Sequence, residues 1–324
     1  MINNNSNNNK FTPIIGLEVH VELKTLSKMF CGCKADYFGH EPNTHCCPVC
    51  LGLPGALPVP NKKAVEWCIM LGLALNCKVN EISYFERKNY FYPDLPKGYQ
   101  ISQYAKPFTY KGYVDYEGNE GKKRIRINRV HMEEDTGKLS HTIIEGEKVS
   151  LVDFNRSGLP LVEIVTEPDF NNTEEVVVYL KKLQQIIRYL GISDADMEKG
   201  SMRLEPTINL KINMGGKVFE TPLVEIKNIN SFRFVKQALE YEIIRQEEEF
   251  NKTHEIKKAG NKTTVGFNEE KKVTVPQRTK EEANDYRYFP DPDIPPMEFT
   301  KLQITNYKLQ IPELPENKTT RFIK

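Results

Sequence analysis

Five of the seven cysteines in this chain fall between Cys31 and Cys50, and their spacing limits how that segment can fold. The order is Cys31-x-Cys33, thirteen further residues, then Cys47-Pro-Val-Cys50, with Cys46 as an extra neighbour. Two short thiolate pairs joined by a loop are what a tetrahedral structural zinc site requires, because each pair spans one edge of the tetrahedron. The spacing therefore predicts zinc binding by Cys31, Cys33, Cys47 and Cys50, and the alternative is a set of buried free thiols.

Length and composition favour a soluble globular protein. A chain of 324 residues has room for about two structural units, and 39% hydrophobic and 27% charged residues are ordinary globular values. No apolar run approaches the length of a membrane span. The Asn-rich first residues lack the apolar stretch of a secretion signal, so we predict a disordered tail at residues 1–12, a cytoplasmic location and reduced thiols. A net charge of +1 leaves RNA binding to local basic clusters.

Hydrophobic periodicity predicts an α+β fold. Strand patterns are expected at residues 15–23 and 125–167, helices at 60–75, 173–190 and 231–249, and an exposed turn or hairpin at 257–272. Strands do not alternate one for one with helices, which favours antiparallel pairing with helices on one side over a doubly wound parallel sheet. The apolar positions switch parity near Asn128, which predicts a β-bulge there.

The sequence holds no phosphate-binding loop, kinase catalytic loop or serine nucleophile elbow, so attention falls on carboxylates and a histidine in strands. Glu18 and His20 are two residues apart, so both project from one face about 6 to 7 Å apart. They can share a metal ion, and the alternative is an ordinary solvated face. Glu163 lies in an apolar run, where a buried carboxylate needs a metal, hydrogen-bond donors or a salt bridge to Arg156.

The segment from Arg124 to Asp135 adds further candidate ligands, and the predicted bulge re-aims the acidic pair Glu133 and Glu134. Oxygen-rich ligands with one imidazole suit magnesium or manganese, and magnesium beside several arginines suggests phosphoryl transfer. Bases alternate with aromatic residues at 86–100 and again at 285–290, so these segments are predicted to stack bases and hold phosphates, the alternative being aromatic plugs of the core.

Long motifs then point to a known family. They read Gly16-Leu-Glu-Val-His20, Cys47-Pro-Val-Cys-Leu-Gly-Leu-Pro-Gly55, Arg87-Lys-Asn-Tyr-Phe-Tyr-Pro-Asp-Leu-Pro-Lys-Gly-Tyr-Gln100, Glu133-Glu-Asp-Thr-Gly-Lys138, Asp153-Phe-Asn-Arg156, Pro160-Leu-Val-Glu-Ile-Val165, Glu225-Ile-Lys-Asn-Ile-Asn-Ser231 and Asp285-Tyr-Arg-Tyr-Phe-Pro290. Over roughly residues 13–295 the chain resembles the GatB family of aspartyl/glutamyl-tRNA amidotransferase subunits. The resemblance implies an antiparallel catalytic cradle similar to glutamine synthetase and guanidino kinases at residues 13–298, with the zinc knuckle inserted at 31–50. Residues 299–324 are then the start of a helical domain, without most of that domain or the tail domain that grips the tRNA body.

The resemblance further implies that ATP phosphorylates the side-chain carboxylate of glutamate on tRNA(Gln) or aspartate on tRNA(Asn), and that ammonia then forms the amide. Ammonia would come from a partner amidase subunit, and a small third subunit would brace the pair. Carried over to this sequence, the catalytic magnesium-site residues are Glu18, His20, Glu134 and Glu163, with Glu133 as a rival of Glu134. Residues predicted to bind ATP or the end of the tRNA are Arg87, Lys88, Tyr90, Lys97, Gln100, Arg156, Arg203, Lys227 and Arg287.

One departure from the family's pattern falls near the predicted ATP site. Where the family usually has Met-Arg followed by Cys-Asp and a later Asn, this chain reads Met202-Arg-Leu-Glu-Pro-Thr207. Glu205 thus stands where the family has the shorter Asp, and Thr207 replaces the Asn. This departure keeps a second interpretation open, a non-catalytic zinc-containing scaffold of the same complex. The expected lack of the tail domain keeps a third open, a ligase that acts on a free amino acid.

Overall fold

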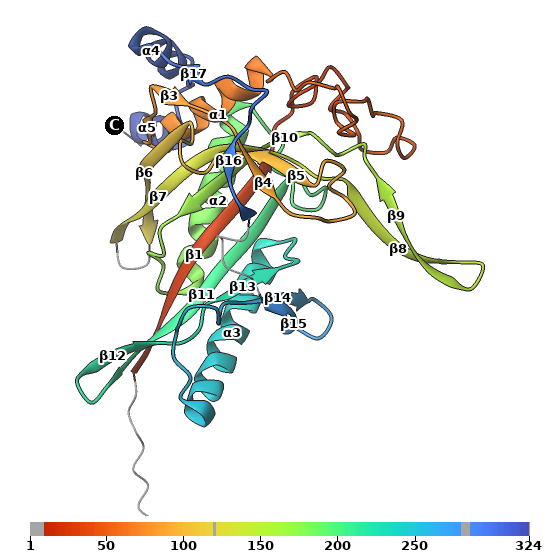
Figure 1. Cartoon of the computed structure of the whole chain (residues 1–324). Coiled ribbons are helices and arrows are strands. Elements are labelled where there is room, and N and C mark those ends of the chain that lie inside the picture. The colour runs from red at the N-terminus through yellow and green to blue at the C-terminus, as the bar shows by residue number, and fades with distance from the viewer. Residues whose placement is uncertain (1–9, 119–120, 280–285, 324) are drawn as a thin grey trace, which may run out of the picture.

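A computed structural model describes residues 10–118, 121–279 and 286–323. Its main body is a ten-stranded sheet in the order β15-β14-β13-β11-β1-β10-β7-β6-β2, with β12 paired to β11 (Figure 1). These strands are β1 (Lys10–Glu22), β2 (Lys78–Val79), β6 (Thr109–Gly118), β7 (Gly121–Glu134), β10 (Pro160–Thr166), β11 (Met202–Met214), β12 (Lys217–Glu220), β13 (Val224–Lys227), β14 (Thr263–Asn268) and β15 (Val273–Thr279). Only β13 and β14 pair in parallel within this sheet, as far as its strands are described. The predicted α+β class with antiparallel pairing is confirmed.

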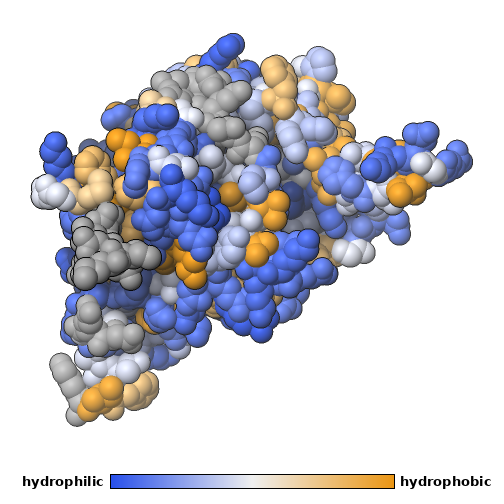
Figure 2. Space-filling model, turned by 90° about the horizontal axis from the view of Figure 1, so that it is seen from below, coloured by the Kyte–Doolittle hydropathy of each residue, from blue (hydrophilic) through white to orange (hydrophobic). Residues whose placement is uncertain are grey.

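Smaller sheets surround the main one. Their strands are β3 (Ile82–Ser83), β4 (Glu86–Asn89), β5 (Tyr99–Ser102), β8 (Lys138–Ile144), β9 (Glu147–Asp153), β16 (Phe289–Pro290) and β17 (Met297–Glu298). β16, β4 and β5 form one sheet, and β17 pairs with β3. β8 and β9 form a hairpin that projects from the body (Figure 1). Seen from below, the surface is largely hydrophilic with separate hydrophobic patches, some of them on this projecting arm (Figure 2).

Five helices accompany these strands in the described part of the chain: α1 (Lys62–Ala74), α2 (Thr173–Leu190), α3 (Phe232–Thr253), α4 (Lys301–Leu309) and α5 (Pro315–Ile323). α1 begins after the cap Asn61, and α2 after Asn172, whose side chain accepts from the amide of Glu175. Gly191 ends α2 with φ of 69°, the left-handed conformation that glycine adopts without strain. The first two predicted helices are thus confirmed. The third runs to Thr253, a few residues past the predicted end.

The hydrophobic core lies where α1, α2 and α3 pack on the sheet. Along β1, Ile15, Leu17, Val19 and Val21 are at most 2% exposed and join a cluster that includes the apolar faces of these helices. The alternate residues of β1 therefore project from the opposite face, which β4 and β5 approach near the end of β7. Because side chains alternate along each strand, the sheet has an apolar face covered by helices and a polar face on the opposite side.

The predicted bulge at Asn128 is confirmed by the strand register. Val165 pairs with Arg129 but Thr166 pairs with Ile127, so Asn128 has no partner on β10. The buried apolar positions of β7 change parity at this point, from Ile127 on one side of the bulge to Val130 and Met132 beyond it. The bulge therefore sets which way Glu133 and Glu134 point.

Two sequence predictions differ from the structure in their bounds. Residues 10–12 belong to β1, so the tail predicted at 1–12 is too long, and residues 1–9 lie outside the described part of the chain. The segment 257–272, predicted as an exposed turn or hairpin, contains β14, which forms a hairpin with β15; Thr264, Val265 and Phe267 are buried there, so only the exposure is wrong for that part. Parallel pairing to β13 buries it. In the described ranges, no helix is both long and apolar enough to cross a membrane.

Gly112 is a testable point of close packing in β6. A Cβ added there would lie 2.3 Å from the Sγ of Cys77 and 2.5 Å from the backbone oxygen of Leu75. We expect Gly112→Ala to lower the free energy of unfolding by about 1 to 3 kcal/mol, because backbone has to shift. Gly16→Ala is the matched control, since its Cβ would meet Pro168 at an ordinary 3.6 Å. Equal urea midpoints for the two variants would contradict this account.

Candidate active site

Three strands bring a histidine, a glutamate and a second histidine into one row on the polar face. His20 on β1 pairs in register with Glu163 on β10, which pairs with His131 on β7. The Nε2 atoms of His20 and His131 lie 3.4 and 3.5 Å from Oε2 of Glu163. Glu163 is only 7% exposed, so its predicted burial is confirmed, and its partners are the two imidazoles rather than Arg156.

Glu133 joins this row from the end of β7. It lies two residues beyond His131 on the same face, and its Oε1 is 3.5 Å from His131 Nε2. The hydroxyl of Ser102 donates to the same oxygen at 2.8 Å, and the side-chain amide of Gln100 donates to the other at 3.2 Å. Donor atoms of His20, Glu133 and Glu163 all lie within 4.8 Å of one another, which fits one small cation.

The electrostatics of the cluster keep its carboxylates ionised. Burial alone would raise the pKa of Glu163, but the charges of His131 and His20 lower the pKa to about 2. Burial likewise acts against ionised Glu133, and Lys88 and His131 hold its pKa well below the usual range. Burial alone would lower the pKa of His20, yet Glu163 raises it to about 9. His20 can therefore bind a cation only after it loses this proton; two anionic oxygens and one neutral imidazole are then donors that magnesium or manganese accepts.

Glu134 points to the other side of β7 and is absent from this cluster. Its Oε1 lies 2.6 Å from the Nζ of Lys97 and accepts from the amide of Ile101 at 2.9 Å. Glu134 and Lys97 line a cavity of about 100 Å³ that also borders Cys31 and Cys50. Because neighbouring residues on a strand alternate, only one of the two consecutive glutamates can face His20, and the structure places Glu133 there.

Glu18 lies on the polar face one step further along β1, outside the group whose donors converge. It is in register with Glu205 on β11, at the position where the family usually has a shorter acid. Glu205 is 2.6 Å from the Nζ of Lys227, which is also 3.2 Å from Glu225. The lengthened acid is therefore held by a lysine at the edge of the same face.

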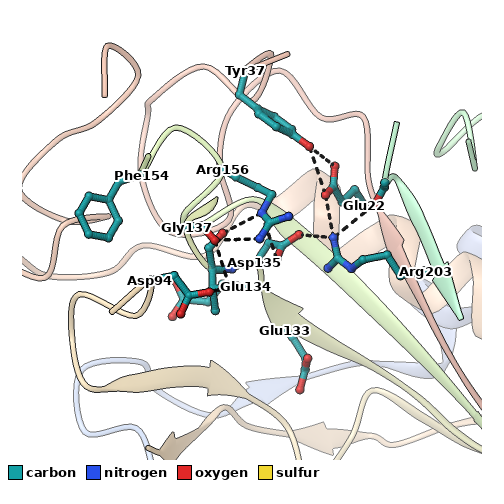
Figure 3. A network of polar contacts seen from close by, with 12 residues as sticks. Glu22, Tyr37, Asp94, Glu133, Glu134, Asp135, Gly137, Phe154, Arg156 and Arg203 are labelled. Atoms are coloured by element: carbon teal, nitrogen blue, oxygen red, sulfur yellow. Dashed lines mark hydrogen bonds and ion pairs between the residues drawn. The ribbon is translucent and has the colours of Figure 1, made fainter. Parts of the chain in front are cut away.

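A second polar network lies beyond the end of β7 and contains two of the predicted arginines (Figure 3). Arg203 is 2.8 Å from Asp135 and 3.0 Å from Glu22, and Tyr37 donates to Glu22. Arg156 lies 3.7 Å from Asp135 and donates to the backbone oxygens of residues 136 and 137. Burial and the charge of Asp135 raise the pKa of Glu22 to about 8. Both arginines are thus engaged by carboxylates or carbonyl groups.

Removing Arg203 should destabilise the fold. We expect Arg203→Met to lower the free energy of unfolding by about 3 kcal/mol, because the buried carboxylate of Asp135 would lose its closest cation and Glu22 would lose a hydrogen-bond donor. Lys24→Met is the control, since its pair with Asp194 is half exposed and such pairs contribute little. Urea denaturation of both variants gives the comparison. A loss no greater than that of the control would show that Arg203 does not compensate these acids.

The other predicted binding residues divide into two groups. Lys88 lies next to the row, where Glu133, Tyr288 and Glu163 raise its pKa well above the usual value despite its burial, and Gln100 contacts the row directly. Arg87 instead pairs with Asp291 and Asp293 and lies 4.2 Å from the ring of Tyr99. Tyr90 packs edge-on against Tyr286, and Arg287 is exposed with φ of 47°. The structure thus brings together only part of the predicted set.

The four predicted zinc ligands converge. The sulfur atoms of Cys31, Cys33, Cys47 and Cys50 lie within 4.8 Å of one another, and those of Cys47 and Cys50 are 3.9 Å apart. Sulfur atoms around a tetrahedral zinc at about 2.3 Å would be about 3.8 Å apart. Cys46 turns away toward Asn155. The cluster can therefore hold a metal ion, and its donors are the type that zinc prefers.

Sequence reasoning left several residues of this face unassigned. His131 and Asp135 lie in the candidate segment Arg124 to Asp135 but were given no specific role, and Ser102 and Glu22 contact the predicted residues without having been proposed as part of the site. His131 and Glu22 could have been predicted from the sequence, because each lies two residues from Glu133 or His20 and so on the same face of its strand. Ser102 had none, because its contact depends on how β5 packs on β7.

Known proteins similar to this chain share one name. The chain is 55% identical over 315 residues to the GatB subunit of the aspartyl/glutamyl-tRNA(Asn/Gln) amidotransferase of Persephonella marina. It is 49% identical over 320 residues and 52% identical over 319 residues to the corresponding proteins from Thermotoga sp. (strain RQ2) and Caldicellulosiruptor saccharolyticus. Each match covers 97% of this chain but 64% of the relative, so the chain spans less than two thirds of their length. A model of the GatB/GatE catalytic domain matches residues 13–305, and the chain therefore belongs to that family.

Proposed function

We propose that this chain is the ATP-using catalytic domain of a tRNA-dependent amidotransferase. In the proposed reaction, the side-chain carboxylate of glutamate on tRNA(Gln) or of aspartate on tRNA(Asn) takes up a phosphoryl group from ATP, and ammonia then replaces it to form the amide. The observation that carries this proposal is the convergence of His20, Glu133 and Glu163 on the polar face of the sheet in a chain from this family.

These three residues fit magnesium by donor type and spacing, and we assign it to them, with Glu133 rather than Glu134 as the third ligand. Magnesium, when bound there, would supply positive charge beside the phosphates of ATP. The protein's own part is to hold the donors: His131 contacts both Glu133 and Glu163, and Ser102 and Gln100 fix the orientation of Glu133. Such outer contacts strengthen a site because they restrict how its ligands can turn.

Glu18 and Glu205 extend the acidic face beyond these ligands, and Lys88 and Lys227 supply positive charge around it. We propose that ATP lies on this face, where fixed charges of both signs can meet its phosphates and the incoming carboxylate. No phosphate-binding loop is needed, because the groups that stabilise charge are side chains of the sheet itself. The fold likeness to glutamine synthetase and guanidino kinases belongs to the same proposal.

Ammonia is assigned to a partner. Because the relatives are named as one subunit of an amidotransferase, we expect this chain to work with an amidase subunit that releases ammonia from glutamine, and with a small third subunit. The four-cysteine cluster is assigned to zinc, with a structural role, because all four positions are filled by cysteines.

The proposal is tested by measuring ATP consumption with ammonium chloride as the amide source and three acceptors in parallel. These are glutamyl-tRNA(Gln), free glutamate and no acceptor. Consumption that requires the mischarged tRNA supports the proposal. Equal consumption with free glutamate would favour a ligase acting on the amino acid. No consumption under any condition, with ATP binding also absent, would favour a scaffold that has lost turnover, for which the residues at 205 and 207 are the sequence argument.

A further inference from the structure

Two tyrosines form an aromatic stack near the row of His20, Glu163 and His131. The rings of Tyr104 and Tyr288 lie 4.7 Å apart with an interplanar angle of 14°, although the two residues are far apart in the sequence. Tyr104 is 50% exposed despite the stack. Tyr288 covers one face of the Tyr104 ring, so the face of Tyr104 that is left for another ring is the one opposite Tyr288.

Hydrogen bonds to buried side chains hold the backbone at Tyr104 in place. A single oxygen of Glu86, which is 4% exposed, accepts from the amides of Tyr104 and Ala105 at 2.6 and 2.7 Å. The preceding residue, Gln103, accepts from the amide of Met132 on β7 at 3.1 Å. An exposed aromatic ring on a backbone held this way loses little conformational entropy when another ring stacks on it.

A guanidinium links this ring to the row. The guanidinium carbon of Arg129 lies 5.8 Å from the centre of the Tyr104 ring, and its Nε is 3.4 Å from Nδ1 of His131. His131 in turn contacts Glu133 and Glu163. Within the described ranges Arg129 is in no ion pair with a carboxylate, so its charge is available to an anionic group. The ring of Tyr104, the guanidinium of Arg129 and the row that begins at His131 therefore lie one after another along the polar face.

We propose that the outer face of Tyr104 stacks an adenine base, with Arg129 placed to meet the phosphate attached to that nucleoside. Aromatic stacking binds a base through its π-face, and an adjacent arginine adds attraction for the phosphate. The inference rests on the proposed function, which supplies two sources of adenine: ATP itself and the terminal adenosine of the tRNA acceptor end. Both would place the base at one end of the row and the reacting group toward its carboxylates.

Three variants of the full chain test the stack. Tyr104→Leu removes the aromatic face, Tyr104→Phe keeps it, and Tyr189→Leu removes a similarly exposed tyrosine from α2 as the matched control. The probes are ATP with magnesium, measured by calorimetry, and tRNA(Gln) with or without its terminal adenosine, measured by filter binding. We expect Tyr104→Leu to weaken binding by about 5- to 150-fold for the ligand that supplies the base. The Phe variant and the control should stay within about twofold of the parent chain.

The pattern of losses identifies the source of the base. Weaker ATP binding with unchanged tRNA binding assigns the stack to ATP. Weaker tRNA binding only when the terminal adenosine is present assigns it to the tRNA end. If the parent chain binds both ligands and Tyr104→Leu binds both equally well, the stacking site is wrong while the proposed function stands. If the parent chain binds neither ligand, the proposed function fails and the stacking site with it.

Discussion

Replacing Glu163 with glutamine is expected to abolish ATP-dependent activation, lowering its rate by about 100-fold or more. The side chain keeps its shape but loses the negative charge that lies between His20 and His131 and that the proposed magnesium requires. Loss of a contact only one step outside a metal site already costs about 10- to 100-fold, so loss of a ligand charge should cost at least as much. In a complex with the proposed amidase partner, glutamine hydrolysis should continue, because that chemistry does not use this face.

The experiment needs a readout apart from turnover. Binding of Mn²⁺ to the isolated chain, followed by electron paramagnetic resonance, should weaken in Glu163→Gln and in Glu133→Gln. Glu117→Gln is the matched control, since Glu117 lies exposed on β6 away from the row. Glu134→Gln separates the two rival glutamates, and manganese binding should survive in it because Glu134 faces Lys97. An active Glu163→Gln variant with normal manganese affinity would disprove the assignment.

The second large effect concerns the four-cysteine cluster. Cys50→Ser is expected to release the bound zinc and to lower the melting temperature by about 10 °C or more. A structural zinc site contributes about 10 to 16 kcal/mol of binding free energy, and one ligand fewer removes several kcal/mol of it. Cys50 is the buried member of the four, and its sulfur accepts from the amide of Cys47 at 3.1 Å.

Cys46→Ser is the control for this experiment. Cys46 neighbours the cluster in sequence, but its thiol faces Asn155. Elemental analysis should find about one zinc per chain in the parent and in Cys46→Ser, and little in Cys50→Ser. A parent chain purified without zinc, or equal zinc and equal melting temperatures in both variants, would refute a zinc-stabilised cluster.

The sequence alone determined those features that depend on local spacing. The period of two along residues 15–23 separates the apolar Leu17 and Val19 from Glu18 and His20, and β1 shows this separation. The two cysteine pairs predicted a four-sulfur cluster, which formed because each pair is short enough to place both thiols at one point. The bulge at Asn128 was predictable from the switch in apolar parity, and the caps of α2 from Asn172 and Gly191.

Only the tertiary structure decided which of these residues meet. Glu133 and Glu134 are adjacent and chemically alike, so sequence could not choose between them, whereas the register after the bulge turns Glu133 toward His20 and Glu134 toward Lys97. His131 entered the site because β7 pairs with β10, a contact across the β8–β9 hairpin that local spacing does not determine. The same holds for the parallel pairing that buries β14. Side-chain alternation is a local property of the backbone, but strand order and register follow from how the whole sheet packs, and that is what assembles the site.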